Sequence, residues 1–235
     1  MTDSNSNALC DPVLIDREIP HGFGHRGSQI PDFTRFPEQV HGIEVCEIES
    51  ADRGAERPKA DIIFTRASGI SVGIVTADCV PILLGTTDGS VVGAIHAGWR
   101  GLAAGVIEAG LLAIRTRAAQ GANFVAAVGP SAGACCYEID TPVCEGLGLR
   151  YGDPLDAFLT ASRPGHFRLD LPGLAVQVLT NNGVERHRIG TENCFCTICS
   201  SLPSGPRFES YRRDASDAGR LRHFISRPAA EASEG

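Results

Sequence analysis

Residues 69–101 read GISVGIVTADCVPILLGTTDGSVVGAIHAGWRG, and this stretch decides the fold. Its first part is a nearly continuous apolar run rich in β-branched residues, which is typical of a strand buried on both faces. The run stops at the polar residues 76–79, and a second strand begins at Val80. Asp88–Gly89 predicts a hairpin turn into a third strand that ends near His96. The stretch therefore predicts three strands, of which the last two form a hairpin.

Weaker signals on both sides of this stretch predict more strands and two covering helices. After His96, apolar residues at helical spacing predict a helix that Gly121 closes, and Pro172 is expected in the first turn of a second helix that ends at Gly183. Further strands are predicted at residues 124–128, 186–190, 207–212 and 221–226. Strands and helices alternate irregularly, which favours an α/β (α+β) fold with mixed β-sheets covered by helices in a single domain. The domain is expected to span residues 21–226, with flexible termini at 1–20 and 227–235.

The composition limits the class of protein. With 235 residues, of which 43% are hydrophobic, the chain can bury the core of one or at most two domains. Its apolar runs are far shorter than the roughly 20 residues of a membrane helix, and no signal peptide is evident, so a cytoplasmic protein without membrane contact is expected. A formal charge of −7 argues against nucleic acid as a partner. Small molecules are the expected ligands, and the oligomeric state is not predicted.

Three predicted strands end near side chains that can bind a metal. These are His41 in EQVHGIEV, Cys79 in TADCVP and His96 in AIHAGWRG. Two imidazoles and one thiolate form a three-ligand set, which leaves the fourth position of a zinc ion open for water or substrate. The separations are too long for a zinc finger and suit ligands brought together from separate strand ends. Asp78, beside Cys79, is expected to orient a ligand or to bind substrate.

Six segments in unbroken order resemble the YfiH family, also called laccase-domain or multicopper polyphenol oxidase-like proteins. Members are described as purine nucleoside phosphorylases, and some carry the name peptidoglycan editing factor. The segments are EQVHG (38–42), TADCVPILL (76–84), AIHAGWRGL (94–102), GPSAGACCYEI (129–139), LDLPGLAVQVL (169–179) and CTICSSLPSGPRFESYRRD (196–214). The resemblance implies a YfiH-like fold and a Zn²⁺ or Cu²⁺ site at His41, Cys79 and His96, which would also be the catalytic residues.

The resemblance further implies phosphorolysis of adenosine, inosine, guanosine and S-methyl-5′-thioadenosine, together with adenosine deamination. Deamination needs a hydroxide, which zinc-bound water supplies once its pKa falls toward about 7. Phosphorolysis needs bound inorganic phosphate, and the planar donors of arginine bind oxyanions in pairs. The candidates are Arg26, Arg100 and either Arg212 or Arg213, with Arg26 and Arg100 ranked first. One of the last two is expected to pair with Asp214.

The segment between Arg26 and His41 departs from the family pattern. Only 14 residues separate the two, where the family is expected to have a longer stretch, and GHRGS replaces a more usual Thr-Arg followed by glycines. The missing residues would help to wall a nucleoside pocket. The role of Arg26 and the preferred nucleoside therefore stay open.

The remaining cysteines give weaker signals. Nine cysteines cannot all pair within one copy, and Cys10, Cys46 and Cys144 are isolated residues expected to pack or to lie at the surface. The adjacent Cys135–Cys136 pair is interpreted as core or as support behind the site. Cys194, Cys196 and Cys199 resemble half of a zinc ribbon, but no second pair lies at the spacing that a ribbon requires. A second structural metal is therefore not predicted.

Other functions remain open from the residues alone. Two His and one Cys also form a blue-copper set, but the only methionine is Met1, and no His-x-His pair supports a multicopper cluster. A cysteine hydrolase acting on amide bonds of peptidoglycan precursors would use Cys79 as nucleophile and His96 as its base. A non-enzymatic zinc-storing or scaffold protein would need the ligands alone.

Overall fold

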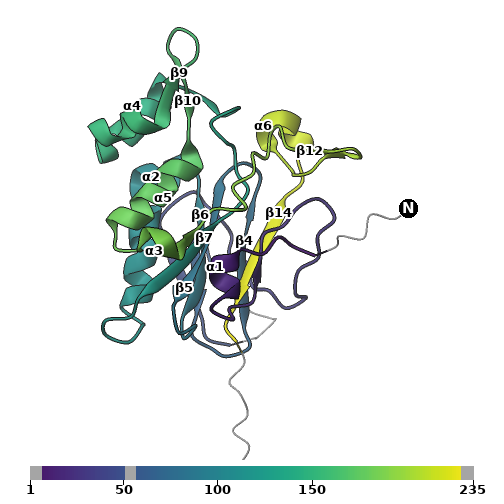
Figure 1. Ribbon diagram of the computed structural model, residues 1–235, viewed down its shortest axis with the longest axis vertical. Helices are drawn as coiled ribbons and strands as arrows, with labels where there is room; N and C mark the ends of the chain where they lie inside the picture. Colours follow the sequence, from purple (N-terminus) through teal and green to yellow (C-terminus); the bar gives the residue numbers. More distant parts are fainter. Residues whose placement is uncertain (1–6, 51–56, 229–235) are drawn as a thin grey trace, which may run out of the picture.

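A six-stranded mixed sheet lies at the centre of the computed structural model, which describes residues 7–50 and 57–228 (Figure 1). Its strand order is β11-β7-β5-β6-β3-β2. β2 runs parallel to β3 and β11 parallel to β7, whereas the other neighbours are antiparallel. The strands are β2 (Val45–Ile48), β3 (Ile62–Thr65), β5 (Val80–Thr86), β6 (Val92–Ala97), β7 (Phe124–Val128) and β11 (Ile189–Gly190).

The central strands are apolar along their whole length because both faces of the sheet are covered. Successive side chains of a strand point to opposite faces. In β5, Ile82 and Leu84 belong to the core on one face, while Leu83 belongs to the core on the other. β7 divides its side chains between the same two cores. The predicted hairpin from Val80 to His96 is confirmed, because β5 and β6 pair antiparallel.

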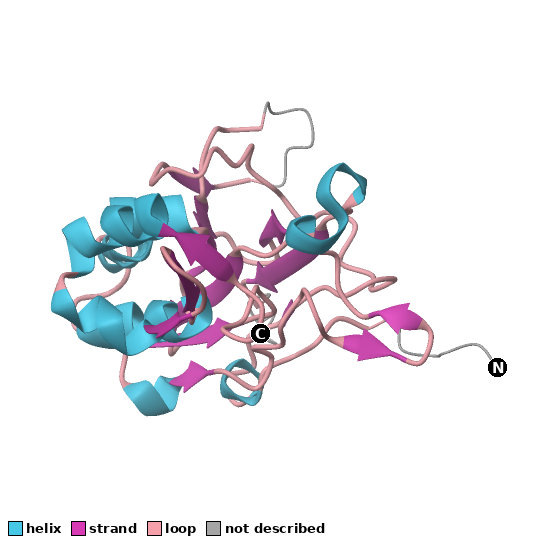
Figure 2. Ribbon diagram, turned by 90° about the horizontal axis from the view of Figure 1, so that it is seen from above, coloured by secondary structure: helices cyan, strands magenta, loops and turns pink. Residues whose placement is uncertain are grey.

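Helices cover one face of this sheet, and Figure 2 shows them gathered on one side of the strands. They are α2 (Trp99–Ala104), α3 (Val106–Arg115) and α5 (Leu171–Asn181), which begins at the N-cap Asp170. The single helix expected after His96 is divided into α2 and α3. Gly105 lies between them with φ of +94°, a left-handed conformation that cannot continue an α-helix.

A three-stranded antiparallel sheet, β1-β14-β4, covers the other face. It consists of β1 (His21–Gly22), β4 (Ser71–Thr76) and β14 (Leu221–Ser226). Between the two layers Phe23, Val72, Ile74 and Ile225 are buried. Because β4 leads directly into β5 through residues 77–79, these few residues connect the two sheets.

The segment before β1 is part of the fold. Leu14, in α1 (Pro12–Ile15), and Ile19 are almost fully buried, and Leu9 exchanges two backbone hydrogen bonds with Phe23. This corrects the expectation of a flexible terminus over residues 1–20 for its described part, because Leu9, Val13, Leu14 and Ile19 pack into the second core. Residues 1–6 and 229–235 lie outside the described residues.

Smaller elements project from one end of the layers. They are β8 (Glu138–Asp140), α4 (Thr141–Tyr151), η1 (Asp153–Phe158), β9 (Leu159–Ala161), β10 (His166–Leu169), η2 (Arg186–Arg188), β12 (Ser201–Leu202), β13 (Gly205–Pro206), α6 (Tyr211–Asp214) and η3 (Ala215–Asp217). The strand expected at 207–212 is wrong, because the Ser210 side chain accepts from the Arg213 amide and starts α6. The strand expected at 186–190 is reduced to the two residues of β11, because η2 occupies its first half.

Candidate active site

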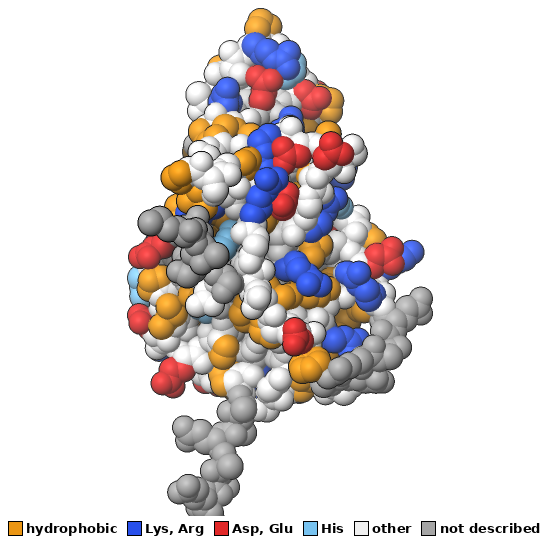
Figure 3. All heavy atoms as spheres, turned by 90° about the vertical axis from the view of Figure 1, so that its right-hand side faces the viewer, with side chains coloured by type: hydrophobic (Ala, Val, Ile, Leu, Met, Phe, Trp, Pro, Cys, Tyr) orange, Lys and Arg blue, Asp and Glu red, His pale blue; other side chains and the backbone are white. Residues whose placement is uncertain are grey.

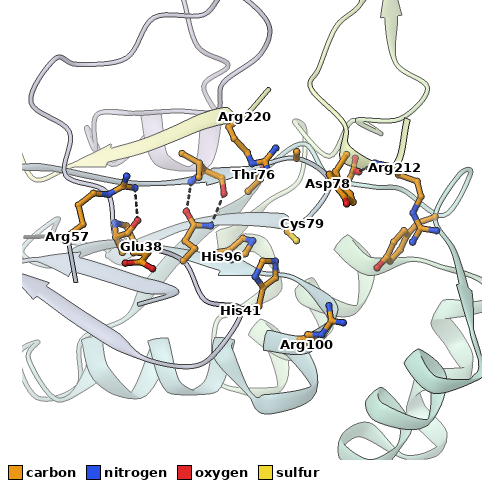
Figure 4. Close-up of a pocket in the computed structure, with 16 residues that line it drawn as sticks. Glu38, His41, Arg57, Thr76, Asp78, Cys79, His96, Arg100, Arg212 and Arg220 are labelled. Carbon is orange, nitrogen blue, oxygen red and sulfur yellow. Dashed lines mark hydrogen bonds between the residues drawn. The ribbon is translucent and has the colours of Figure 1, made fainter. Parts of the chain in front are cut away.

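Strand register brings Cys79 and His96 together. Val80 pairs with Ala97 and Pro81 with His96, so Cys79 lies beside the end of β6. His41 approaches from the loop that precedes β2. The nearest ligand atoms of the three side chains all lie within 4.8 Å of one another. In Figure 4 the two imidazoles lie next to Cys79 at one wall of a cavity.

The sequence pattern placed His41 near the end of a strand, but in the structure it lies in a turn. It has φ of +61° in a tight turn formed by residues 40–42. The backbone amides of Val40, His41 and Gly42 all donate to the carboxylate of Asp61, at 3.1, 3.0 and 2.8 Å. The turn therefore wraps around a buried carboxylate, which fixes the position of His41.

Asp61 also positions His96. Its Oδ1 lies 2.7 Å from His96 Nδ1, and neither side chain is more than 4% exposed. A ligating histidine is commonly oriented by a carboxylate at its second nitrogen. Nδ1 therefore carries the proton that bonds to Asp61, and Nε2 is left for the cluster. The sequence reading missed Asp61, although a lone carboxylate directly before the apolar strand IIF was a signal for it.

The electrostatics of the three residues favour a thiolate. Burial alone would raise the pKa of Cys79, but hydrogen bonds from His41 and His96 lower this pKa to about 6. Burial alone would lower the pKa of His96, but hydrogen bonds to Asp61 and Cys79 raise it to about 9. In the metal-free protein near neutral pH, Cys79 is therefore a thiolate next to an imidazolium.

Close approach of the backbone keeps the three side chains together. Gly98, the N-cap of α2, passes so near the site that a Cβ there would lie 2.8 Å from Cys79 Sγ and 3.4 Å from a carbon of the His41 ring. A side chain at position 98 would therefore push the thiol out of place. This explains the glycine that follows the short strand end at His96–Ala97.

A cavity of about 510 Å³ opens in front of the three residues. Four arginines line it, Arg57, Arg100, Arg212 and Arg220, together with the aromatic rings of Tyr137 and Tyr211. In Figure 4, Arg57 lies on one side of the histidines and Arg212 on the other. Lys and Arg side chains are mixed with Asp and Glu on the face shown in Figure 3.

Arg100 and Arg212 differ from the other arginines of the cavity. The guanidinium of Arg100 stacks on Trp99 at 4.5 Å, and that of Arg212 stacks on Tyr137 at 5.1 Å. Within residues 7–50 and 57–228, neither one forms an ion pair with a carboxylate. Nη1 of Arg212 donates to the carbonyl of Glu138 at 3.1 Å, and both arginines keep further donors for an added anion. Arg57 and Arg220, which were not predicted from the sequence, also donate to nearby backbone carbonyls.

Asp78 links the segments around the cavity. Its backbone has φ of +94°, and its carboxylate accepts from the Thr197 hydroxyl and from the Arg212 amide, both at 2.6 Å. Both carboxylate oxygens are thus already bonded within the protein. Asp78 lines the cavity, and these two bonds hold the backbone of Arg212 and the loop around Thr197 in position.

Arg26 lies elsewhere. Its Nη2 donates to Glu209 at 2.9 Å and to Asp214 at 3.1 Å, and it is not among the residues that line the cavity. Arg213 forms the expected ion pair with Asp214, at 2.6 Å. The structure therefore brings Arg100 and Arg212 to the three metal-capable residues, but not Arg26.

The structure also brings together a second group that the sequence reading set aside. The sulfur atoms of Cys135, Cys136, Cys196 and Cys199 lie within 4.8 Å of one another. The interpretation of the Cys135–Cys136 pair as core is wrong for Cys135, which is exposed, and both thiols face another cysteine pair. Cys194 is outside this group and donates to the carbonyl of Val128.

The three-layered fold with a His₂Cys site between its sheets defines a known class of α/β protein. YlmD from Geobacillus stearothermophilus is 30% identical over 84% of this chain and 74% of its own, with a TM-score of 0.71. A Bacillus licheniformis protein described as hypothetical protein YfiH shares the fold, with a TM-score of 0.77 at 22% identity over 89% of this chain and 92% of that one.

Residues 25–228 match the family described as multi-copper polyphenol oxidoreductase laccase, and the chain belongs to this family. A relative from Xylella fastidiosa named purine nucleoside phosphorylase is 38% identical over 206 residues, 86% of this chain and 75% of the relative. Purine nucleoside phosphorylase YfiH from Escherichia coli is 34% identical over 199 residues, 83% of this chain and 74% of the relative. The YfiH resemblance and the mixed α/β fold are thus confirmed. None of the described helices is long and apolar enough to cross a membrane.

Proposed function

We propose that the protein is a purine nucleoside phosphorylase that binds zinc at His41, Cys79 and His96. The observation that carries the proposal is the convergence of these three side chains at the wall of an arginine-lined cavity. The volume of about 510 Å³ lies within the range of roughly 300–1,000 Å³ that is typical of small-molecule sites. Relatives over 30% identical carry the name of this activity.

The three residues fit a zinc ion. His96 bonds to Asp61 through Nδ1 and so offers Nε2, Cys79 offers a thiolate, and all three ligand atoms lie within 4.8 Å. Two nitrogens and one sulfur leave one coordination position open, which is typical of catalytic zinc. When bound there, zinc would polarise an oxygen and lower the pKa of water to about 7. Cu²⁺ is the second choice, because a blue-copper site adds an axial thioether and the described residues include no methionine.

Arg100 and Arg212 would hold the phosphate. Their guanidinium planes are fixed by stacking on Trp99 and Tyr137, and the Arg212 amide is held by Asp78. A fixed guanidinium presents paired donors to an oxyanion with little loss of side-chain entropy. These two residues therefore position a phosphate oxygen for attack on the sugar.

The tyrosines would hold the purine. Tyr137 and Tyr211 line the same cavity, and aromatic rings stack on purine bases. A phosphate oxygen forms a bond to C1′ of the ribose as the glycosidic bond breaks, and the electron pair goes to the purine nitrogen, which takes a proton. The products are the free base and the 1-phosphate of the sugar, which is ribose 1-phosphate from a ribonucleoside and 5-methylthioribose 1-phosphate from S-methyl-5′-thioadenosine. Adenosine, inosine, guanosine and S-methyl-5′-thioadenosine are the proposed substrates, and hydrolysis of adenosine to inosine and ammonia is the proposed second activity.

The largest effect is expected from Cys79→Ser. Loss of a metal ligand should lower phosphate-dependent release of adenine from adenosine by about 1,000-fold, because metal ions contribute several kcal/mol to such reactions. The measurement is adenine formation with and without phosphate, together with the zinc content of each protein. Cys10→Ser is the matched control, because Cys10 is exposed and its thiol donates only to backbone carbonyls.

A competing function would give a different result. If protein stripped by a chelator still released adenine at the full rate, the zinc mechanism would be wrong. If Cys79→Ser abolished hydrolysis of peptidoglycan-type amide bonds while phosphorolysis was undetectable in any variant, Cys79 would be a nucleophile and not a ligand. Phosphorolysis that survived Cys79→Ser would leave only a storage or scaffold role for the three residues.

A further inference from the structure

Two loops far apart in the sequence each contribute a pair of thiols to one point. Cys135 and Cys136 lie in the loop between β7 and β8, and Cys196 and Cys199 lie in the loop between β11 and β12. All four sulfur atoms lie within 4.8 Å of one another, and those of Cys135 and Cys199 are 3.5 Å apart. We propose that these four cysteines bind a structural zinc ion, separate from the candidate active site.

The distances suit one tetrahedral ion. With Zn–S bonds of about 2.3 Å, the sulfurs of a tetrahedral site lie about 3.8 Å apart. The separation of 3.5 Å between the sulfurs of Cys135 and Cys199 is close to this value, and no two of the four sulfurs are more than 4.8 Å apart. An iron–sulfur cluster binds its thiolates to different iron atoms and so needs them further apart. Four protein ligands leave no open position, so the ion is structural and not catalytic.

Backbone amides prepare one of the sulfurs for a cation. The Gly133 amide donates to Cys196 Sγ at 3.4 Å, and the amides of Ile198 and Cys199 also donate to this sulfur. Amide donors stabilise the negative charge of a thiolate, which is the form in which cysteine binds zinc.

Two arginines border the group. Four thiolates around Zn²⁺ would carry a net charge of −2, which Arg168 would offset in part, whereas the charge of Arg213 is already paired with Asp214. Nη1 of Arg213 donates to the carbonyls of Thr197 and Ile198, inside the Cys196–Cys199 turn, at 2.9 and 3.2 Å. Arg168 donates to the carbonyl of Cys135. Each cysteine pair thus has a guanidinium bonded to its backbone.

The two loops are already joined next to the thiols. The Ser131 amide donates to the Phe195 carbonyl at 3.1 Å, and the Thr197 amide donates to the Ser131 carbonyl at 2.9 Å. This bridge fixes the relative position of the two cysteine pairs. The ion would hold the same junction in place and, with it, Tyr137 and Thr197, which follow Cys136 and Cys196 and reach the cavity and Asp78.

The test is the metal content of protein purified with a reductant and without added metal. Wild type is expected to hold two zinc ions per chain. Cys199→Ser should lose one of them, and Cys79→Ser should lose the other. Cys194→Ser is the matched control, because it removes a neighbouring thiol that is not among the four. Equal zinc contents in wild type and Cys199→Ser would overturn the proposal.

Cobalt provides a measurement that does not depend on the folding of Cys199→Ser. In Cys79→Ser protein reconstituted with Co²⁺, the proposal expects the intense visible bands of tetrahedral cobalt bound by four thiolates. Absence of these bands would overturn it. A Cys135–Cys199 disulfide found by non-reducing peptide mapping of reductant-treated protein would also overturn it, and would assign the pair a redox role. Neither result bears on phosphorolysis, which is tested through Cys79.

Discussion

The protein gathers thiols in two different ways. At the candidate active site, the paired strands β5 and β6 set the distance between Cys79 and His96, and one buried carboxylate orients the histidines. In the second group, two loops carry all four cysteines, and a short backbone bridge joins the loops. A site built on strands is positioned by the sheet before any metal binds. A site built on loops needs the ion to complete its own framework.

Asp61→Asn would test whether the protein itself positions the ligands of the candidate active site before zinc binds. Removing the charge that orients His96 should weaken zinc binding at the candidate active site by about 10- to 100-fold and leave the other site unchanged. The measurement is zinc retained per chain at increasing chelator concentration. Asp88→Asn is the control, because its carboxylate bonds only within the hairpin turn between β5 and β6. Equal zinc retention by Asp61→Asn and wild type would mean that the strands alone position the ligands.

Arg100→Ala should have an effect of similar size that acts on one substrate only. Loss of a charge-assisted hydrogen bond costs about 1.5–3 kcal/mol, so KM for phosphate should rise about 10- to 100-fold while KM for the nucleoside changes little. Steady-state kinetics with each substrate varied in turn would measure this. Arg117→Ala is the matched control, because Arg117 pairs with Glu47 outside the cavity. An unchanged phosphate KM would remove Arg100 from its role.

His223 sets an acid sensitivity that does not depend on metal. It is fully buried between Thr76 and Gly24, and burial lowers its pKa to about 3. Below pH 6.5 the His223 imidazole takes up a proton in the unfolded chain but stays neutral in the folded chain. Stability should therefore fall as the pH drops from 6.5 toward 3, with a slope from this residue that approaches about 1.4 kcal/mol per pH unit.

The measurement is urea unfolding of metal-free protein between pH 7 and 4. His223→Gln should be less stable at pH 7 but should show a shallower decline toward pH 4. The part of the pH dependence that is the same in wild type and His223→Gln then comes from titratable groups other than His223. If the two proteins declined in parallel, His223 would not be neutral in the fold. This baseline is needed before acid-induced metal loss from the two sites can be compared.

Many strands of the two main sheets could be predicted from the sequence, because they are strongly apolar and buried. Continuous apolar runs predict β5 in the six-stranded sheet and β4 in the three-stranded sheet, and β7 and β14 are predictable for similar reasons. The helix at 141–151 was missed because its pattern is weakly amphipathic, with glycines at positions 146 and 148. The strand expected at 207–212 was wrong because a cap at Ser210 outweighs local strand propensity.

The candidate site was predicted only in part, for a related physical reason. His41, Cys79 and His96 stand in recognisable segments, and Arg100 and Arg212 lie in the same kind of segment. Asp61, Arg57 and Arg220 reach the site from segments whose proximity depends on the packing of the two sheets. The four-cysteine group was missed because a ribbon-like spacing was required, whereas tertiary contact between two loops replaces that spacing.

The use of Asp61 by both histidines has a consequence for protein engineering. The same carboxylate holds the amide of His41 and the imidazole of His96, so the two ligands move as one unit. Exchanging His96 would remove a partner of this carboxylate and so disturb the turn that carries His41, whereas an exchange of His41 keeps its backbone amide on Asp61. A redesign of this centre would therefore begin with the carboxylate and choose the ligands afterwards.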